Sequence, residues 1–191
     1  KQVGVPFGTA AQRVITEALT QAKIEGVKFV NLGMLEHAPL ITKYKDDEKW
    51  GEYDALSGFD PIPAILEVGK AVKTIHKGKV CAMVVVNKGL LEKNEKLAKN
   101  LIKSVRQAYE YYVKNTKQAN EWFVAEASMK NATDEVFDIA AEYEPNLKKG
   151  EKIRTSFNDD DFKLIQNAAD FVSKSTNKSI KITDFVSNKY Q

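Results

Sequence analysis

Residues 3–12 have the sequence VGVPFGTAAQ, in which an apolar strand ends at a Pro and a Gly and a helix follows. Gly8 permits a tight turn, and Thr9 is a residue type that caps helix N-termini. Apolar side chains then recur at helical spacing from Ala11 to Ala22. Such a turn directs backbone N–H groups and the positive end of a helix dipole toward an anion or a polar oxygen.

A second turn of this kind lies at residues 53–61, YDALSGFDP. Asp60 can cap the helix that follows, with Pro61 in the first helical turn. Phe59 and the Asp60 carboxylate are then left at the carboxyl end of the strand. Open α/β sheets bind their ligands at that end, so both turns indicate a binding edge.

The first part of the chain alternates between strand and helix patterns. We expect strands at 2–5, 27–31 and 53–57, and helices at 9–25, 34–44 and 60–68. This alternation indicates an α/β fold with a mainly parallel sheet and right-handed crossovers. A further strand is expected at 80–87, in the middle of a sheet, because the run is apolar on both faces.

Beyond residue 88 the pattern is helical. We expect a long amphipathic helix through 97–113 capped by Asn94, and helices at 117–128 after Thr116, 134–143 after Thr133, 159–173 after Asn158, and 184–189 after Thr183. The change of character at residues 69–79 divides the chain into two expected domains, residues 1–79 and residues 80–191.

Composition and charge indicate an ordinary globular protein. The 191 residues are 43% hydrophobic and 29% charged, and 29 basic against 26 acidic residues give a net charge of +3. The charges are interspersed, so we expect no nucleic-acid partner. The densest basic stretch, 70–79, alternates Lys with Val and Ile, which favours a solvated strand edge. Cys81 lies in an apolar run and is expected to be a buried thiol.

Motifs for metal or cofactor chemistry are lacking, and we expect neither a metal nor a cofactor. His37 and His76 have no acidic or cysteine neighbours at ligand spacing. The acidic run 159–161 has no Gly or terminal Glu of a calcium loop and is better explained as a helix start. No apolar run approaches the ~20 residues of a membrane span.

The order of the motifs resembles the periplasmic substrate-binding proteins of ABC importers. The group in question binds nitrate, sulfonates and taurine, with relatives that bind thiamine precursors. The matching segments are 5–11 (VPFGTAA) and 27–32 for the opening of the second lobe, 53–61 for the strand that ends at the ligand, 84–94 for the return into the first lobe, and 162–185 for the closing helix and tail.

The resemblance implies a type II periplasmic-binding fold. Residues 1–79 would form the second α/β lobe with its ligand-facing turns, and residues 80–191 the return strand and helical part of an incomplete first lobe. Such a protein captures a small polar or anionic solute between two lobes without chemistry and is not an enzyme. The resemblance assigns ligand contacts to Phe7, Gly8, Thr9, Ala10, Gln12, Gly33, Met34, Ser57, Phe59 and Asp60.

The implied partners are the solute and an ABC permease in the membrane. We expect a monomer that is periplasmic or extracellular, and a membrane tether would require a segment upstream of Lys1. Two residues depart from the family pattern: Phe59 stands where relatives often have Trp, and Gln12 where some have His. The solute therefore does not carry over from the relatives.

The role of Asp60 and the class of the protein both stay open at this point. Asp60 either turns into its own helix cap or pairs with an ammonium group on the ligand, as an amino-sulfonate would offer. A ligand-sensing domain of a transcription regulator has a similar architecture but needs a helix-turn-helix segment. Pyrimidine-forming enzymes share the fold but need a cluster of His and Cys around iron, and this chain has two His and one Cys.

Overall fold

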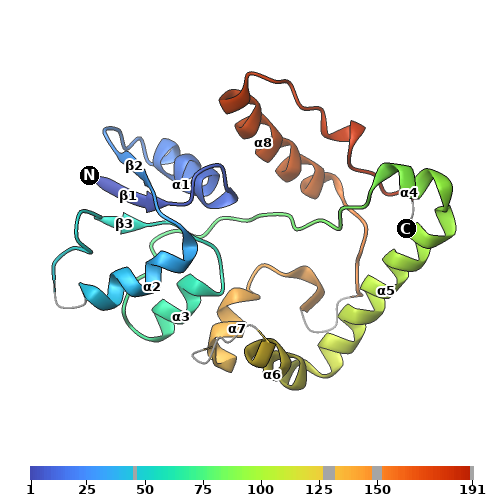
Figure 1. Ribbon diagram of the computed structural model, residues 1–191, viewed down its shortest axis with the longest axis horizontal. Helices are drawn as coiled ribbons and strands as arrows, with labels where there is room; N and C mark the ends of the chain where they lie inside the picture. The colour runs from blue at the N-terminus through green and yellow to red at the C-terminus, as the bar shows by residue number, and fades with distance from the viewer. Residues whose placement is uncertain (45–46, 127–131, 148–151, 190–191) are drawn as a thin grey trace. The chain divides into compact units, whose positions relative to one another are not determined.

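The computed structural model describes residues 1–44, 47–126, 132–147 and 152–189 (Figure 1). The chain divides into two compact units. The first comprises Lys1–Lys79 with Asn131–Ala140, and the second Val80–Lys130 with Ala141–Gln191. Residues 131–140 join the first unit, although nothing in the sequence pattern separates them from the helical second part. The assignment of residues 1–79 to a ligand-binding lobe stays a prediction.

A three-stranded parallel sheet forms the centre of the first unit. The strands are β1 (Gln2–Val5), β2 (Lys28–Asn31) and β3 (Ala55–Leu56), in the spatial order β2-β1-β3. Their positions confirm the expected strands, and β3 is shorter than expected. Backbone hydrogen bonds extend the β3 pairing at both ends, from Asp54 N to Gln2 O and from Ser57 N to Gly4 O, each 2.9 Å long.

The helices of the first unit cover both faces of this sheet. They are α1 (Ala10–Gln21), α2 (Met34–Lys43), α3 (Ile62–Val68) and α7 (Asp134–Ala140). The β1–β2 and β2–β3 connections cross the sheet in opposite directions, so right-handed crossovers put α1 and α2 on opposite faces (Figure 1). α3 packs beside α2, and α7 packs against α3. The first unit is therefore mixed α/β, as expected.

Close packing at the middle of β1 requires a glycine. Val3 and Val5 are buried on one face of the strand. On the other face, a Cβ at Gly4 would lie 2.8 Å from Leu32 Cδ2 and 2.9 Å from Leu56 Cδ2. These side chains, which follow β2 and lie on β3, fill the space that a larger residue would need. Gly4 thus lets both neighbouring strands pack against β1.

All the regular secondary structure in the described part of the second unit is helical. Its elements are α4 (Lys88–Lys93), α5 (Glu95–Lys114), α6 (Thr116–Glu126), the 3-10 helix η1 (Pro145–Leu147), α8 (Asp159–Thr176) and the 3-10 helix η2 (Ile182–Asp184). Two expected caps are confirmed. Asn94 Oδ1 accepts from Leu97 N at 3.0 Å, and Asn158 Oδ1 accepts from Asp161 N at 2.9 Å.

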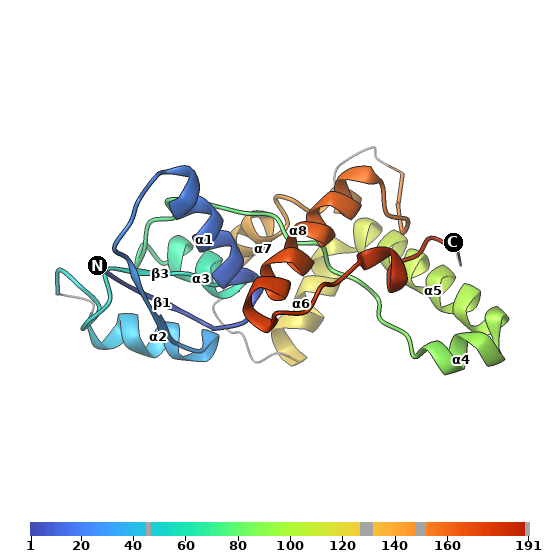
Figure 2. The ribbon, with the colours of Figure 1, turned by 90° about the horizontal axis from the view of Figure 1, so that it is seen from above.

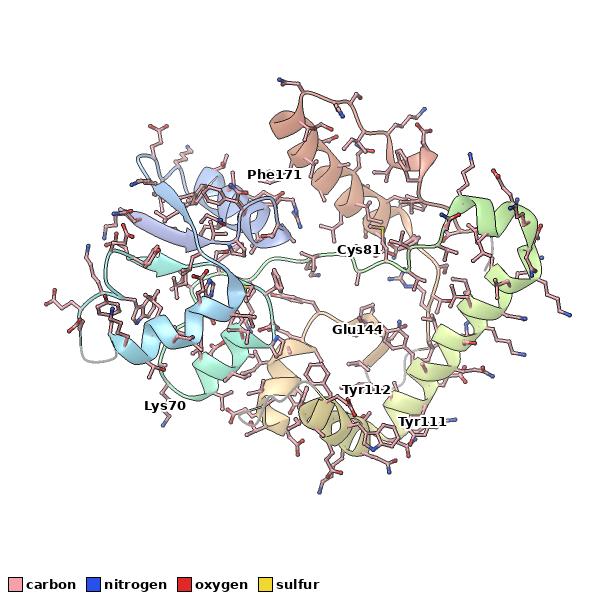
Figure 3. All side chains as sticks on the ribbon, viewed as in Figure 1. Lys70, Cys81, Tyr111, Tyr112, Glu144 and Phe171 are labelled. Atoms are coloured by element: carbon pink, nitrogen blue, oxygen red, sulfur yellow. The ribbon has the colours of Figure 1, made fainter. Side chains whose placement is uncertain are left out.

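Polar side chains hold the helices of the second unit together. Asn146 is buried and exchanges two hydrogen bonds with the backbone of Arg154, of 2.8 and 2.7 Å. The Arg154 guanidinium pairs with Asp161 in the first turn of α8. Burial alone would raise the pKa of Asp161, but this pair and the Asn158 N–H lower it below its usual value. Figure 3 shows Tyr111 and Tyr112 at the end of α5, beside α6.

The expected strand at 80–87 is wrong. The segment has no regular secondary structure, and Val84 and Val85 are 50% and 88% exposed. An apolar run indicates that burial would be favourable, but it does not supply a neighbouring strand. All three strands in the described residues belong to the first unit, and none pairs with this segment. Cys81 within it is half-buried rather than buried, and residues 70–79 likewise form no strand edge.

Expectations near several helix ends are also corrected. Thr116 does not cap α6 but is its first residue, and its hydroxyl donates to Tyr112 O at 3.0 Å. The expected end of that helix at residue 128 lies outside the described residues. No helix forms at 184–189 beyond η2, because the Asn188 amide is engaged with the backbone N–H and C=O of Phe157, at 2.9 and 2.8 Å. α7 ends at Ala140 rather than 143, and α8 continues to Thr176.

Two helices of the first unit end in the same way, with a lysine in the left-handed conformation. Lys23 has φ 54° after α1 and Lys70 has φ 57° after α3. At the first, Ile24 N donates to Leu19 O at 2.9 Å and the Lys23 N–H to Thr20 O at 3.1 Å, a Schellman motif. This motif ends α1 at Gln21 instead of the expected residue 25. Figure 3 shows Lys70 at the periphery of the first unit.

Replacing either lysine by glycine should stabilise the first unit. Left-handed backbone is unfavourable for residues with a Cβ, so Lys23→Gly and Lys70→Gly should each raise the free energy of unfolding by about 0.5–1 kcal/mol. Urea denaturation measures the change. Lys28→Gly, in β2, is the matched control and should lower stability, because glycine weakens a strand. Equal effects at all three positions would contradict the left-handed caps.

Candidate functional site

The candidate site lies at the carboxyl edge of the three-stranded sheet. Because the strands are parallel, the turns that follow them, at residues 6–9, 32–33 and 57–61, meet at one edge. The turn after β1 leads to one face of the sheet, and the turns after β2 and β3 lead to the other. Open α/β sheets bind ligands at such a switch of direction. All ten sequence-predicted ligand residues belong to these turns or to the first turn of the following helix.

The turn between β1 and α1 is closed by its own side chains. Gly8, with φ 71°, donates its N–H to Gln12 Oε1 at 2.8 Å. The Phe7 N–H donates to Asn31 Oδ1 at 3.0 Å, which joins this turn to the end of β2. Thr9 occupies the N-cap position of α1, but its hydroxyl donates to Pro6 O at 2.6 Å and caps nothing. Figure 2 shows the short passage from β1 into α1.

Several groups of this turn that were expected to contact a solute therefore have partners within the protein, and their contact with a solute stays a prediction. The N–H groups of Phe7 and Gly8 were expected to face a solute, and both are bonded within the protein. The Gln12 amide oxygen and the Thr9 hydroxyl proton are engaged as well. The N–H groups of Ala10 and Ala11 donate to no other described residue. They are the backbone donors that α1 leaves at this edge, as the first turn of every α-helix does.

The turns after β2 and β3 are in direct contact. Gly33 is the N-cap of α2, and its N–H donates to Glu36 Oε2 at 2.6 Å. A Cβ at Gly58 would lie 2.7 Å from both Sδ and Cε of Met34, so the β3 turn rests on the first residue of α2. The β3 turn also reaches α1, because Ser57 Oγ donates to Ala11 O at 3.0 Å. The three turns form one connected group.

Two aromatic side chains flank this group. Phe7 and Phe59 are each 48% exposed, the first after β1 and the second after β3. Beside Phe59, the carboxylate of Asp60 accepts the Ala64 N–H through Oδ1 at 3.2 Å. α3 begins at Ile62 rather than at residue 60, and Pro61 is its N-cap instead of lying in its first turn. Of the two roles open to Asp60, the contact with the helix start is therefore formed, from the position before the N-cap. Pairing of the Asp60 carboxylate with a ligand ammonium stays a prediction.

Four residues of this group escaped the sequence-based prediction: Asn31, Glu36, His37 and Gly58. Glu36 follows Gly33 by three positions, the spacing at which a Glu side chain can accept the N–H of the N-cap residue, and this spacing was a usable signal. Asn31 was visible only as the last residue of a strand. Gly58 and His37 become recognisable only in the folded chain, where Gly58 passes close to Met34 and the His37 ring.

His37 is the most buried polar side chain near the site. It is 2% exposed, and its Nε2 atom has no hydrogen-bond partner among the described residues. Burial lowers the pKa of the imidazole, while a hydrogen bond with the backbone of Leu32 and the charge of Glu36 act in the opposite direction. The net effect keeps the ring neutral at pH 7. The buried Nε2 atom therefore has no hydrogen-bond partner among the described residues, whichever tautomer the ring adopts.

The second unit offers a poorer site. In the described residues, no group of three or more His, Cys, Asp or Glu side chains is arranged to hold a metal ion. Burial raises the pKa of the Cys81 thiol, which keeps it protonated and a poor nucleophile. None of the described helices has the length and apolar character needed to cross a membrane.

Acid should destabilise the first unit through His37. The pKa of His37 in the folded state lies below its unfolded value of 6.5. The neutral ring therefore contributes its full stabilisation above pH 6.5, and this stabilisation is lost as the pH falls from 6.5 towards the folded-state pKa. The free energy of unfolding should fall by up to about 1.4 kcal/mol per pH unit between about pH 6.5 and the folded-state pKa. His37→Asn should flatten this slope in urea titrations, and an unchanged slope in this variant would contradict the role of His37.

Comparison of the chain with protein-family models, with curated proteins and with solved structures found no match. The resemblance to substrate-binding proteins of ABC importers therefore stays a prediction. The features that bear on function are the parallel sheet, the three connected turns at its carboxyl edge, and the donors and acceptors that these turns present.

Proposed function

We propose that the chain is the solute-binding component of an ABC import system, of the group that captures nitrate, sulfonates, taurine or thiamine precursors. The first unit acts as one wall of the binding site and holds the solute without chemical change. A membrane permease then receives the solute. This assignment places the protein in the periplasm or outside the cell.

One observation supports this proposal above the others: three turns meet at one sheet edge, where the chain switches from one face to the other. Hydrogen bonds between the turns fix their relative positions, from Phe7 N to Asn31 Oδ1 and from Ser57 Oγ to Ala11 O. A site that is preorganised in this way binds a small ligand without first ordering its own backbone.

The chemistry at the edge suits a small ligand with two kinds of polar group. The N–H groups of Ala10 and Ala11, at the positive end of α1, suit an oxyanion such as a sulfonate or nitrate group. Asp60 suits an ammonium group at the other end of the ligand. The half-exposed rings of Phe7 and Phe59 suit an apolar portion between the two.

A single substitution can remove one backbone donor and keep the fold. Ala10 is the first residue of α1, a position that favours proline, and the extended backbone of Thr9 before it accepts a following proline. Ala10→Pro should weaken the binding of an anionic solute about tenfold or more, because it removes one N–H from a charged acceptor. Ala10→Gly keeps the N–H and should bind as the unchanged protein does.

Calorimetric titration with nitrate, an alkyl sulfonate, taurine and an aminomethylpyrimidine measures this effect. Heat of binding from at least one of these compounds supports the proposal. If none of them binds the unchanged chain, solute capture by this group of ligands is wrong. If Ala10→Pro binds as tightly as Ala10→Gly, the α1 terminus is not the anion site.

Asp60 allows a test of the ligand's cationic end. Asp60→Asn keeps an oxygen for the Ala64 N–H and removes the charge, so it should lower the affinity for taurine about tenfold and leave that for an alkyl sulfonate unchanged. Asp60→Ala also removes this acceptor and should destabilise the protein by about 1 kcal/mol. Equal effects of Asp60→Asn on both ligands would reject the pairing with an ammonium.

A further inference from the structure

The excess positive charge of the chain belongs to α4 and α5. Residues 88–114, which contain these two helices, have seven basic and three acidic residues, a net charge of +4. The whole chain carries +3, so the other residues together are slightly negative. The even mixing of charges over the whole sequence conceals this local excess, which favours an anionic partner.

One side of α5 combines lysines with exposed apolar side chains. At 3.6 residues per turn, six exposed residues project from an arc of about 160° around the helix axis. This surface is called the lysine–leucine face, and it consists of Lys96, Leu97, Leu101, Lys103, Tyr111 and Lys114. Its two leucines and its tyrosine are between 36% and 43% exposed.

The acidic residues of α5 lie outside the lysine–leucine face. Glu95 and Glu110 project from the other part of the helix circumference, and Glu95 Oε1 pairs with Lys99 Nζ at 2.9 Å. None of the three lysines of the face forms an ion pair with a described residue. Their charge is therefore uncompensated within the described part of the chain.

α5 packs on the second unit through its opposite side. Ala98 is buried there, and Val105 and Tyr109 are half-buried. The elements that pack most extensively against α5 are α4, α6 and η1, and all three belong to the second unit (Figure 1). The lysine–leucine face is thus a surface of the second unit alone.

An aromatic pair extends the lysine–leucine face onto α6. Tyr111 stacks on Trp122, with ring centroids 5.8 Å apart and ring planes inclined by 7°. Trp122 is 53% exposed, and the Tyr111 hydroxyl donates to Gln118 Oε1 at 2.7 Å. Tyr and Trp are enriched where proteins meet a membrane–water interface, because each combines an apolar ring with a polar group.

We propose that the lysine–leucine face is a docking surface for an anionic lipid membrane, with α5 parallel to the plane of the bilayer. The lysines contact lipid phosphates. Leu97, Leu101 and the Tyr111–Trp122 pair enter the boundary between headgroups and acyl chains. α5 is 20 residues long, so the contact extends over about 30 Å.

The combination of charged and apolar side chains favours a membrane over other anionic partners. A nucleic-acid backbone would pair with the lysines but would give the two leucines no apolar partner. An anionic bilayer supplies phosphate groups and an apolar layer together, along the whole helix. The inference does not depend on the proposed function, because vesicle binding can succeed or fail whether or not the first unit captures a solute.

The first test is co-sedimentation of the full 191-residue chain with lipid vesicles. The protein should pellet with vesicles of equal parts phosphatidylglycerol and phosphatidylcholine, and should stay in solution with phosphatidylcholine alone. Lys96→Gln combined with Lys103→Gln should lower the affinity about tenfold or more, because two charges near the anionic surface are lost. Lys163→Gln combined with Lys174→Gln, at exposed positions of α8, removes the same charge and should change the affinity less than about twofold.

The second test measures the apolar part of the contact. Leu97→Gln should lower the affinity for the anionic vesicles about fivefold, because an apolar side chain is lost from the interface. In a Trp50→Phe background, Trp122 is the remaining tryptophan. Its fluorescence should shift to shorter wavelengths when anionic vesicles are added, because the ring leaves water. An unshifted emission under conditions where the protein pellets would place the contact elsewhere and overturn the proposal.

Three further results would overturn the proposal. The chain fails to pellet with anionic vesicles at low ionic strength; or the α8 variant loses as much affinity as the α5 variant, which assigns the attraction to net charge; or a short DNA duplex binds more tightly than the vesicles and Leu97→Gln changes neither affinity, which assigns the face to nucleic acid. Circular dichroism of each variant should match that of the unchanged chain, because the lysines and Leu97 are exposed.

Discussion

The pairing of β1 on both of its edges is the constraint on which the first unit depends. Hydrogen bonds to β2 on one side and to β3 on the other place this strand at the centre of the sheet. Gly4 allows the two neighbours to close in, and Val3 and Val5 bury the opposite face. Since the turns of the candidate site begin where these strands end, the site inherits its geometry from β1.

The sequence predicted the first unit well because its signals are local. Strands at 2–5 and 27–31, and helices beginning near residues 10 and 34, follow from periodicity and from Gly and Pro at the turns, and the structure confirms them. Parallel pairing then brings the predicted residues to one edge. The hydrogen bonds of Gln12 and Thr9 were not predictable, because a side chain near a turn can face either a ligand or its own backbone.

The second unit shows where sequence patterns fail. Caps at Asn94 and Asn158 were predicted correctly, since capping depends on residues within one turn. The strand at 80–87 and the helix at 184–189 were wrong, since each depends on a distant partner. Residues 80–87 have no neighbouring strand in the described part of the chain. At the expected helix 184–189, the Asn188 side chain instead bonds to the backbone of Phe157. Tertiary contacts override local propensity at both places.

The hydrogen bond from the Gly8 N–H to Gln12 Oε1 closes the β1–α1 turn with an acceptor from the protein itself. The amide oxygen of Gln12 already occupies the position from which an incoming acceptor would approach the Gly8 N–H. Under the proposed function, a solute would either displace this oxygen by rotation of the Gln12 side chain or bind to the neighbouring N–H donors. Gln12 thereby holds the shape of the turn, and under the proposed function a solute would compete with an acceptor that is covalently attached nearby.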